Sequence, residues 1–359
     1  MNVLHGRRGS LLALLASLSA LLLAGGCALV PEEVSRSEPS AYLEYSPQIY
    51  ARLSGQALRD ITKGMNDEEL SDFLTTLMSN PQVSQQAGQL SGQQGSSPQG
   101  QGAGVGSPSA SSNATIDASF IKGFLDKTNS FGAGVRGIGT DQPRAEAVFL
   151  GRFSPISLRL ALTMEGNWRR LDDGGYKSVQ YPLYLRSPQA GWIHLSTEAN
   201  PPQKAVLPLP FPEPMKALAL SDIFISINDP KILFSGTLPL EASAIPLETV
   251  LVSGIIDSSG SAAVPVSSSG PGSPADALRN YAIELRVVAK DEATARAYRP
   301  VIRFLWAATA VRIFGNRGDI AALPLSLEGS VYVVRGIRLS GSEIRDILKP
   351  KGMPGGLTP

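Results

Sequence analysis

The sequence predicts an α+β fold in which a largely antiparallel sheet carries packed helices. Short segments of alternating apolar and polar residues, separated by Gly, Pro and Asp turns, crowd the stretch 145–257. Segments with helical spacing flank that stretch, and a strand-helix-strand-helix unit follows over 275–349. The chain has 36 Gly and 27 Pro among 359 residues, which indicates many turns, and 43% hydrophobic residues suffice for a core.

The body begins at residue 41 and extends to 257. Alternation over 41–46 predicts a short strand. Three helices are then predicted from apolar spacing, over 53–63, 67–78 and 117–131. Ser54 is the expected N-cap of the first helix, and Asn66 with Glu69 has the spacing of a capping box for the second.

Residues 82–113 form a different kind of segment. Of these 32 residues, 23 are Gln, Gly or Ser, and none is charged. Such a composition buries too little apolar surface to offset the entropy lost on ordering. We expect a disordered insert that is dispensable for folding.

Strand signals dominate the next part of the chain. Strands are predicted over 145–153, 156–165, 168–171, 176–185, 192–197, 222–227 and 247–257. Asp172-Asp173-Gly174-Gly175 predicts a hairpin turn. Two adjacent carboxylates could also serve acid–base chemistry, but directly before Gly-Gly they fit a solvated hairpin tip better.

The C-terminal unit alternates regularly. Its predicted elements are a strand over 281–289, a helix over 291–314 with a kink at Pro300, a strand over 330–335 and a helix over 340–348. Arg299, Arg303 and Arg312 interrupt the apolar run of the long helix, so a half-buried core helix is predicted rather than a membrane span. A flexible tail is expected over 350–359.

Two further patterns have structural and functional interpretations. Residues 53–61 are echoed by 339–347, with six of nine positions identical, which indicates either an ancient duplication or two ordinary helix starts. Residues 132–137 match G-x-G-x-x-G, but the motif follows a predicted helix and precedes a strand. Dinucleotide binding needs the opposite order, so a glycine-rich helix C-terminus is predicted instead.

The chain is poor in the residues of common catalytic sites. It has two His and one Cys, and His5 lies within the N-terminal residues 1–26, so His194 is the body's only imidazole. A His/Cys metal site cannot be assembled, a Ser-His-Asp triad would need His194, and neither a cofactor nor a catalytic residue is predicted. Strand alternation places Trp192, His194 and Ser196 on one face, either a ligand-binding groove or the solvent-exposed face of a sheet.

The N-terminal residues 1–26 have the pattern of a signal peptide. Arg7 and Arg8 precede an apolar run over 11–24, and small residues lead to Cys27. The segment Leu23-Ala24-Gly25-Gly26-Cys27 resembles the lipobox of bacterial lipoproteins, which implies that Cys27 carries the lipid. A lone exported thiol has no disulfide partner, and lipidation would consume it.

Residues 27–40, with two Pro and three Glu between 30 and 40, predict an extended tether. Within the lipoprotein resemblance, an Asp directly after the cysteine would signal retention in the inner membrane. Ala28 stands there instead, which implies the outer membrane. The body loosely resembles lipoproteins of treponemes and related spirochaetes.

Removal of the signal would leave 30 basic and 31 acidic residues, which gives no electrostatic reason to bind nucleic acid. We therefore expect a non-enzymatic protein, anchored to the membrane by its lipid and facing the periplasm or the cell surface, that binds an envelope partner or ligand. The alternative is a periplasmic hydrolase or transferase that uses carboxylates.

Overall fold

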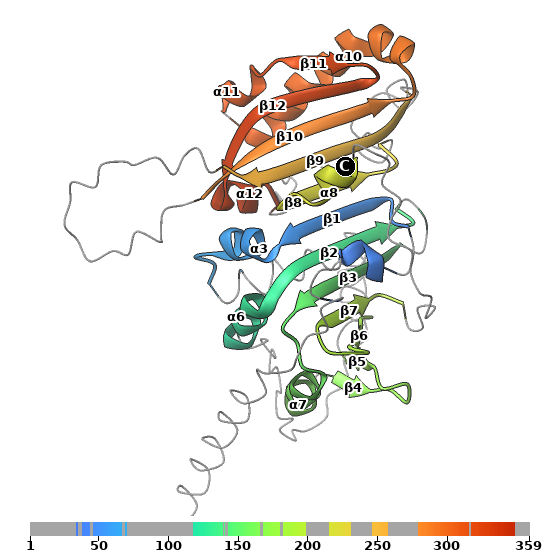
Figure 1. The fold of residues 1–359 in the computed structure, drawn as a ribbon, viewed down its shortest axis with the longest axis vertical. Coiled ribbons are helices and arrows are strands. Elements are labelled where there is room, and N and C mark those ends of the chain that lie inside the picture. The colour runs from blue at the N-terminus through green and yellow to red at the C-terminus, as the bar shows by residue number, and fades with distance from the viewer. Residues whose placement is uncertain are drawn as a thin grey trace, which may run out of the picture.

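The computed structural model describes residues 34, 38–43, 46–66, 69, 118–138, 140, 143–165, 168–179, 182–198, 215–230, 246–257, 279–315 and 317–348. They form a twelve-stranded sheet in which every neighbouring pair of strands is antiparallel (Figure 1). Helices pack against this sheet, so the predicted α+β class is confirmed. Cys27, the insert 82–113, the tail 350–359 and most of the predicted helix 67–78 lie outside the described residues.

The strand order across the sheet is β11-β12-β10-β9-β8-β1-β2-β3-β7-β6-β5-β4. In chain order the strands are β1 (Ile49–Ser54), β2 (Thr128–Arg136), β3 (Arg144–Gly151), β4 (Trp168–Arg170), β5 (Tyr176–Ser178), β6 (Tyr184–Arg186), β7 (Trp192–Ser196), β8 (Ile223–Ile227), β9 (Leu247–Ile256), β10 (Asn280–Ala289), β11 (Leu325–Glu328) and β12 (Val331–Ser340). The first strand of the chain therefore lies in the interior of the sheet, hydrogen-bonded to β2 and β8.

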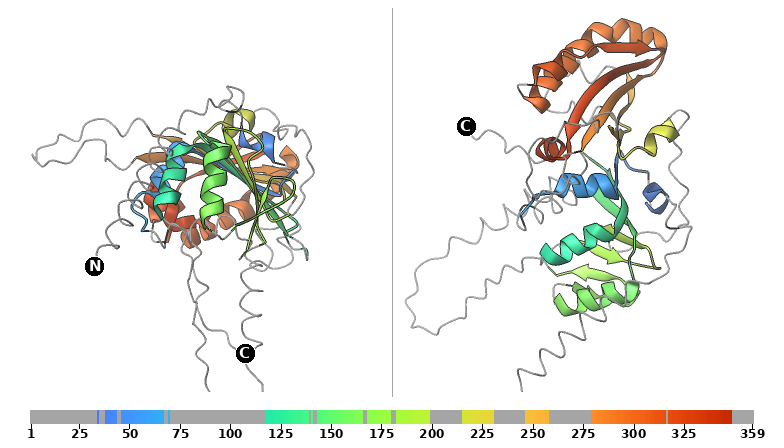
Figure 2. Two further views of the ribbon diagram at one scale, coloured as in Figure 1. Left: turned by 90° about the horizontal axis from the view of Figure 1, so that it is seen from below. Right: turned by 60° about the vertical axis from the view of Figure 1, so that its left-hand side comes forward.

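One face of the sheet is covered by a layer of helices (Figure 2). These are α3 (Gly55–Thr62), α6 (Ala118–Lys127), α7 (Pro155–Glu165), α10 (Glu292–Phe314) with the short α11 (Gly318–Ala321), and α12 (Gly341–Leu348). Their inward side chains share one apolar core with the strands, which extends from Leu158 and Leu162 of α7 to Trp306 of α10. Burial of this continuous core is the main source of stability for the whole sheet.

The opposite face of the sheet is covered by the N-terminal segment and α8 (Met215–Ala219). The 3₁₀ helix η2 (Pro39–Tyr42) lies over β2 and β3. We call Val34 together with residues 38–43 the strap. Val34 and Leu43 are buried with Tyr50, Phe224 and other side chains of this face. The strap needs Gly132, because a Cβ at that position would lie 2.5 Å from the Cβ of Pro39.

Two N-terminal predictions need correction. The C-terminal end of the predicted tether 27–40 is folded onto the sheet, since Pro39 and Ser40 are buried. The predicted strand over 41–46 is wrong, because Glu38 caps a helical turn that Pro39 begins, and the strand starts later, at Ile49. Alternation among few residues did not distinguish a short apolar turn from a strand.

Two further element predictions are wrong. Residues 156–165, predicted as a strand, form α7, whose first residue is Pro155 and whose backbone begins with a bond from Leu158 N–H to the Ser154 carbonyl. The predicted helix 117–131 ends at Lys127, so the G-x-G-x-x-G segment, predicted as a helix C-terminus, belongs mainly to β2 in the interior of the sheet. Segment 176–185, predicted as one strand, is divided between β5 and β6.

The remaining strands and the C-terminal unit agree with the sequence. The turn at 172–175 joins β4 to β5, as predicted. The C-terminal unit contains β10, α10, β12 and α12 as predicted, but β12 extends beyond the predicted 330–335 to Ser340, and the unit also contains α11 and β11, which were not predicted. Because β10 pairs with β9, the unit extends the same sheet. Asp291 caps α10, and Ser340 with Glu343 forms a capping box for α12. Asn66 and Glu69 exchange the corresponding pair of hydrogen bonds.

The sequence echo marks two similar corners of the fold. In each copy a strand runs directly into a helix, β1 into α3 and β12 into α12, and the two helices pack against each other. A glycine opens each helix, because a Cβ at Gly55 would lie 2.1 Å from the Thr128 carbonyl oxygen and one at Gly341 would lie 2.6 Å from that of Asp60. Both corners therefore require the same three residues: Ser caps the helix, Gly allows the close backbone approach, and Leu is buried at the end of the strand.

Candidate functional site

The residues that the sequence proposed as a ligand-binding face lie on β7. Trp192, His194 and Ser196 share one face of the strand, as alternation predicts. That face is largely buried: His194 is 3% and Ser196 1% exposed, while Trp192 is partly exposed. The ring of Tyr42 in the strap lies 4.8 Å from the ring of Trp192, centroid to centroid. The expectation of a solvent face is therefore wrong.

His194 is paired with a carboxylate that the sequence analysis did not identify. Its Nε2 lies 3.0 Å from Oε2 of Glu146 on the neighbouring strand β3, and the Glu146 side chain has no exposed surface. The signal in the sequence was a single acid within the apolar run of β3. Ser196 uses its Oγ to accept a hydrogen bond from the Glu198 N–H. This geometry makes the pair a buried polar link between two strands.

A second buried polar cluster holds the strap to β1. The Tyr50 hydroxyl donates to Oε1 of Glu38 at 2.6 Å, and the Ser40 N–H donates to Oε2 at 3.1 Å. Burial raises the pKa of Glu38, opposed by these hydrogen bonds and by the charge of Arg52. Burial, followed by the charge of Glu38, also raises the pKa of Tyr50 well above its usual value. The cluster therefore fixes the strap to β1.

The most unusual surface in the described structure is the outer side of α10. Val301, Phe304 and Val311 are 42%, 70% and 58% exposed, while Ile302, Trp306 and Ala310 on the opposite side of the helix are buried. Exposed Ala297 and Ala308 complete the stripe. We call these five exposed residues the outer face of α10. The prediction of a half-buried helix is confirmed, but the sequence analysis missed the apolar character of its exposed half.

Arginines border this outer face. Viewed down the helix at about 100° per residue, Arg303 and Arg296 lie on one flank and Arg312 lies on the other. No helix among the described residues is both long and apolar enough to cross a bilayer. The helix is instead doubly amphipathic, with one apolar side in the core and a second apolar side turned outward.

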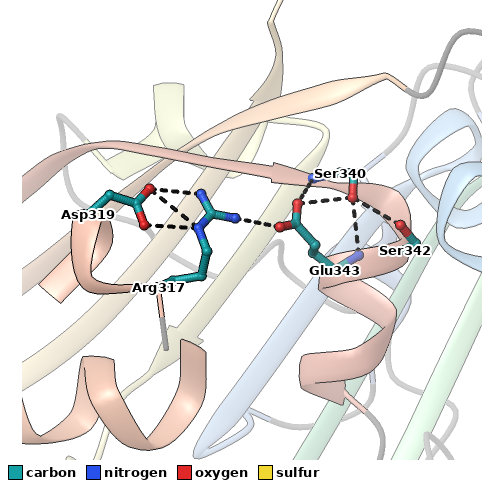
Figure 3. Close-up of polar contacts among 5 residues, drawn as sticks. All are labelled: Arg317, Asp319, Ser340, Ser342 and Glu343. Atoms are coloured by element: carbon teal, nitrogen blue, oxygen red, sulfur yellow. Dashed lines mark hydrogen bonds and ion pairs between the residues drawn. The ribbon is translucent and has the colours of Figure 1, made fainter. Parts of the chain in front are cut away.

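A polar network connects the C-terminal end of α10 to α12 (Figure 3). The Arg317 guanidinium donates to both carboxylate oxygens of Asp319 and to Oε1 of Glu343, and Glu343 in turn accepts from the Ser340 backbone N–H and hydroxyl. Ser342 Oγ lies 3.0 Å from Ser340 Oγ. All of these groups satisfy one another around the start of α12, which indicates a structural clamp.

The other carboxylates do not form a common centre. Asp173 accepts a hydrogen bond from Arg186 at 2.6 Å on the surface, so the Asp172-Asp173 pair lies at a hairpin tip as expected. Among the residues that the structure describes, no three His, Cys, Asp or Glu side chains are grouped so that they could hold a metal ion.

Comparisons with known proteins give a limited result. No family model and no curated protein matches the chain. Its structure is similar to that of TP0453, a treponemal protein, in crystal form IV with a TM-score of 0.47 at 9% identity, covering 88% of this chain and 98% of that one. Crystal form III gives a TM-score of 0.45 at 8% identity, with the same coverage.

Proposed function

We propose that this chain is a lipid-anchored envelope protein, held at the outer membrane through Cys27, that acts by binding a partner through the outer face of α10 rather than by catalysis. The observation that carries the proposal is the exposed apolar stripe of Val301, Phe304 and Val311. Burying apolar surface stabilises a complex by about 25 cal/mol per Å². A contiguous apolar stripe with a charged border is typical of an interaction surface rather than of ordinary solvent exposure.

The strap supports the anchored part of the proposal. Val34 is 1% exposed and lies seven residues after Cys27. Seven residues span at most about 25 Å when fully extended. A lipid on Cys27 would therefore hold the folded body directly against the bilayer, without a long linker.

One experiment with two readouts tests this proposal in the native cells. A photoreactive amino acid replaces Phe304 in the wild-type chain and in Cys27→Ser, and the matched control carries it at Val179, which is 69% exposed against 70% for Phe304. We expect the wild type in the detergent phase with an adduct specific to position 304, and Cys27→Ser in the aqueous phase. A Cys27→Ser chain that partitions like the wild type would refute the anchor, and equal adducts at 179 and 304 would refute the binding surface.

A further inference from the structure

We infer that the outer face of α10 docks an acidic amphipathic helix of a partner protein, and that it points away from the bilayer to which the chain is anchored. This inference rests on the proposed function and names the partner's chemistry. It is carried by the arrangement of charge around α10 and by the position of the strap on the opposite side of the sheet.

The outer face has the geometry of a helix-docking stripe. Ala297, Val301, Phe304, Ala308 and Val311 recur at intervals of three or four residues, so they form a single row along the helix. Alanines lie on both sides of Phe304 along this row, and such small residues let a second helix approach closely while Phe304 provides a central anchor. This pattern of anchors at i, i+3, i+4 and i+7 is the one that helix-in-groove recognition reads.

The charge on α10 selects the chemistry of that second helix. The helix carries four arginines and a single acidic residue, Glu292, which pairs with Arg296. Arg303, on one flank of the outer face, has no ion-pair partner among the residues that the structure describes, whereas Arg299 lies on the opposite side of the helix near Tyr332. A second copy of α10 would bring like charges together, so self-association through this face is disfavoured. A partner with Asp or Glu beside its apolar residues would neutralise the exposed arginines.

An anionic bilayer would also match apolar residues bordered by arginine, but the strap argues against the bilayer that holds the lipid. The strap and α8 lie on one side of the sheet and the helices on the other (Figure 2). The strap lies about 10 Å from the sheet on one side, and the axis of α10 lies about 10 Å from it on the other. With the radius of the helix, about 25 Å of protein separates the strap from the outer face of α10. The seven residues from Cys27 to Val34 reach about that far only in a straight line, which would pass through the sheet.

The test uses the full mature chain with Cys27→Ser, so that no lipid competes. Three probes are compared: a helical 20-residue peptide with Leu in a stripe bordered by Glu, the same peptide with Lys in place of Glu, and phosphatidylglycerol vesicles. Peptide binding is measured by fluorescence anisotropy and vesicle binding by flotation. We expect the Glu peptide alone to bind, with an affinity that falls as salt is raised.

Variants locate the binding surface. Phe304→Ser should weaken binding of the Glu peptide at least tenfold, Val301→Ser should weaken it in the same direction, and the exposure-matched control Val179→Ser should leave it unchanged. Arg303→Ala should weaken binding and flatten its salt dependence, whereas Arg299→Ala, on the opposite side of the helix, should change neither. Circular dichroism melts check that each variant is folded.

Every other outcome overturns the inference. Vesicle binding that is lost in Phe304→Ser would assign the face to a membrane, and equal binding of the Glu and Lys peptides would show that charge does not select the partner. If the photoreactive residue forms an adduct in cells specifically at position 304, but the Glu peptide does not bind, only this inference is refuted. Loss of both the adduct and all probe binding would also refute the proposed binding function.

Discussion

At the scale of single residues, the most constrained group is the carboxylate of Glu146. It is completely buried and its described partner is His194. A buried hydrogen-bonded polar pair adds little net stability, but removing one partner takes a hydrogen bond from the other, which is destabilising. The sequence could place Trp192, His194 and Ser196 on one face but not predict their burial. Part of their cover is the strap, whose Tyr42 packs on Trp192 from about 150 residues earlier in the chain.

The first prediction concerns this pair. His194→Ala should lower the free energy of unfolding by about 1–3 kcal/mol, because Glu146 would stay buried and lose its hydrogen bond to His194. Urea denaturation at pH 7 measures the loss. The double variant Glu146→Leu with His194→Leu should recover much of it, since both polar groups are then removed. A loss below about 1 kcal/mol in the single variant would show that the pair is not an energetic unit.

At the scale of elements, α7 shows where sequence patterns fail. Ile156, Leu158, Leu160 and Leu162 alternate with other residues, which predicts a strand, yet Leu158 and Leu162, one helical turn apart, face the core. Pro155 at the first helical position and good helix formers, three Leu with Ala, Arg, Met and Glu, favour the helix locally. The alternation is incidental, because Ile156 and Leu160 are exposed, at 79% and 37%.

The two strand-to-helix corners yield the second prediction. Gly55→Ala and Gly341→Ala should each destabilise the fold by about 1–3 kcal/mol or more, because the new Cβ would collide with the backbone of a neighbouring element. The control is Gly123→Ala inside α6, where nothing lies within 4 Å of the added Cβ. That variant should be stabilised by about 0.5–1 kcal/mol. Thermal unfolding ranks the three, and equal effects would show that the corners are not tightly packed.

At the scale of the whole molecule, local patterns identified most strands but not how they are joined. Antiparallel alternation predicted β3, β7, β8, β9 and β10 within a few residues. The sequence divided the chain into a body ending at 257 and a separate unit from 275, and the pairing of β9 with β10 joins them in one sheet. Pairing between strands far apart in the chain depends on long-range packing, which a local pattern does not carry.

The third prediction follows from this continuity. Because a single core extends from α7 to α10, both ends of the sheet should unfold together. A variant that keeps only Trp306 reports on one end, and a variant that keeps only Trp168 reports on the other. For each variant, the fluorescence transition in urea should coincide within error with the circular dichroism transition of the same variant. Two separated midpoints would reveal independent domains.

The interior position of β1 has a consequence for the timing of synthesis. Arg52 of β1 donates a hydrogen bond to the Ser221 carbonyl, 169 residues later in the chain. At about 5–20 residues per second, a ribosome needs roughly 10–30 s to make that interval. During this delay β1 has an open edge, which is the condition under which nascent strands aggregate. A charged residue in the middle of the waiting strand disfavours premature pairing, so Arg52 would protect the nascent chain before it serves the finished sheet.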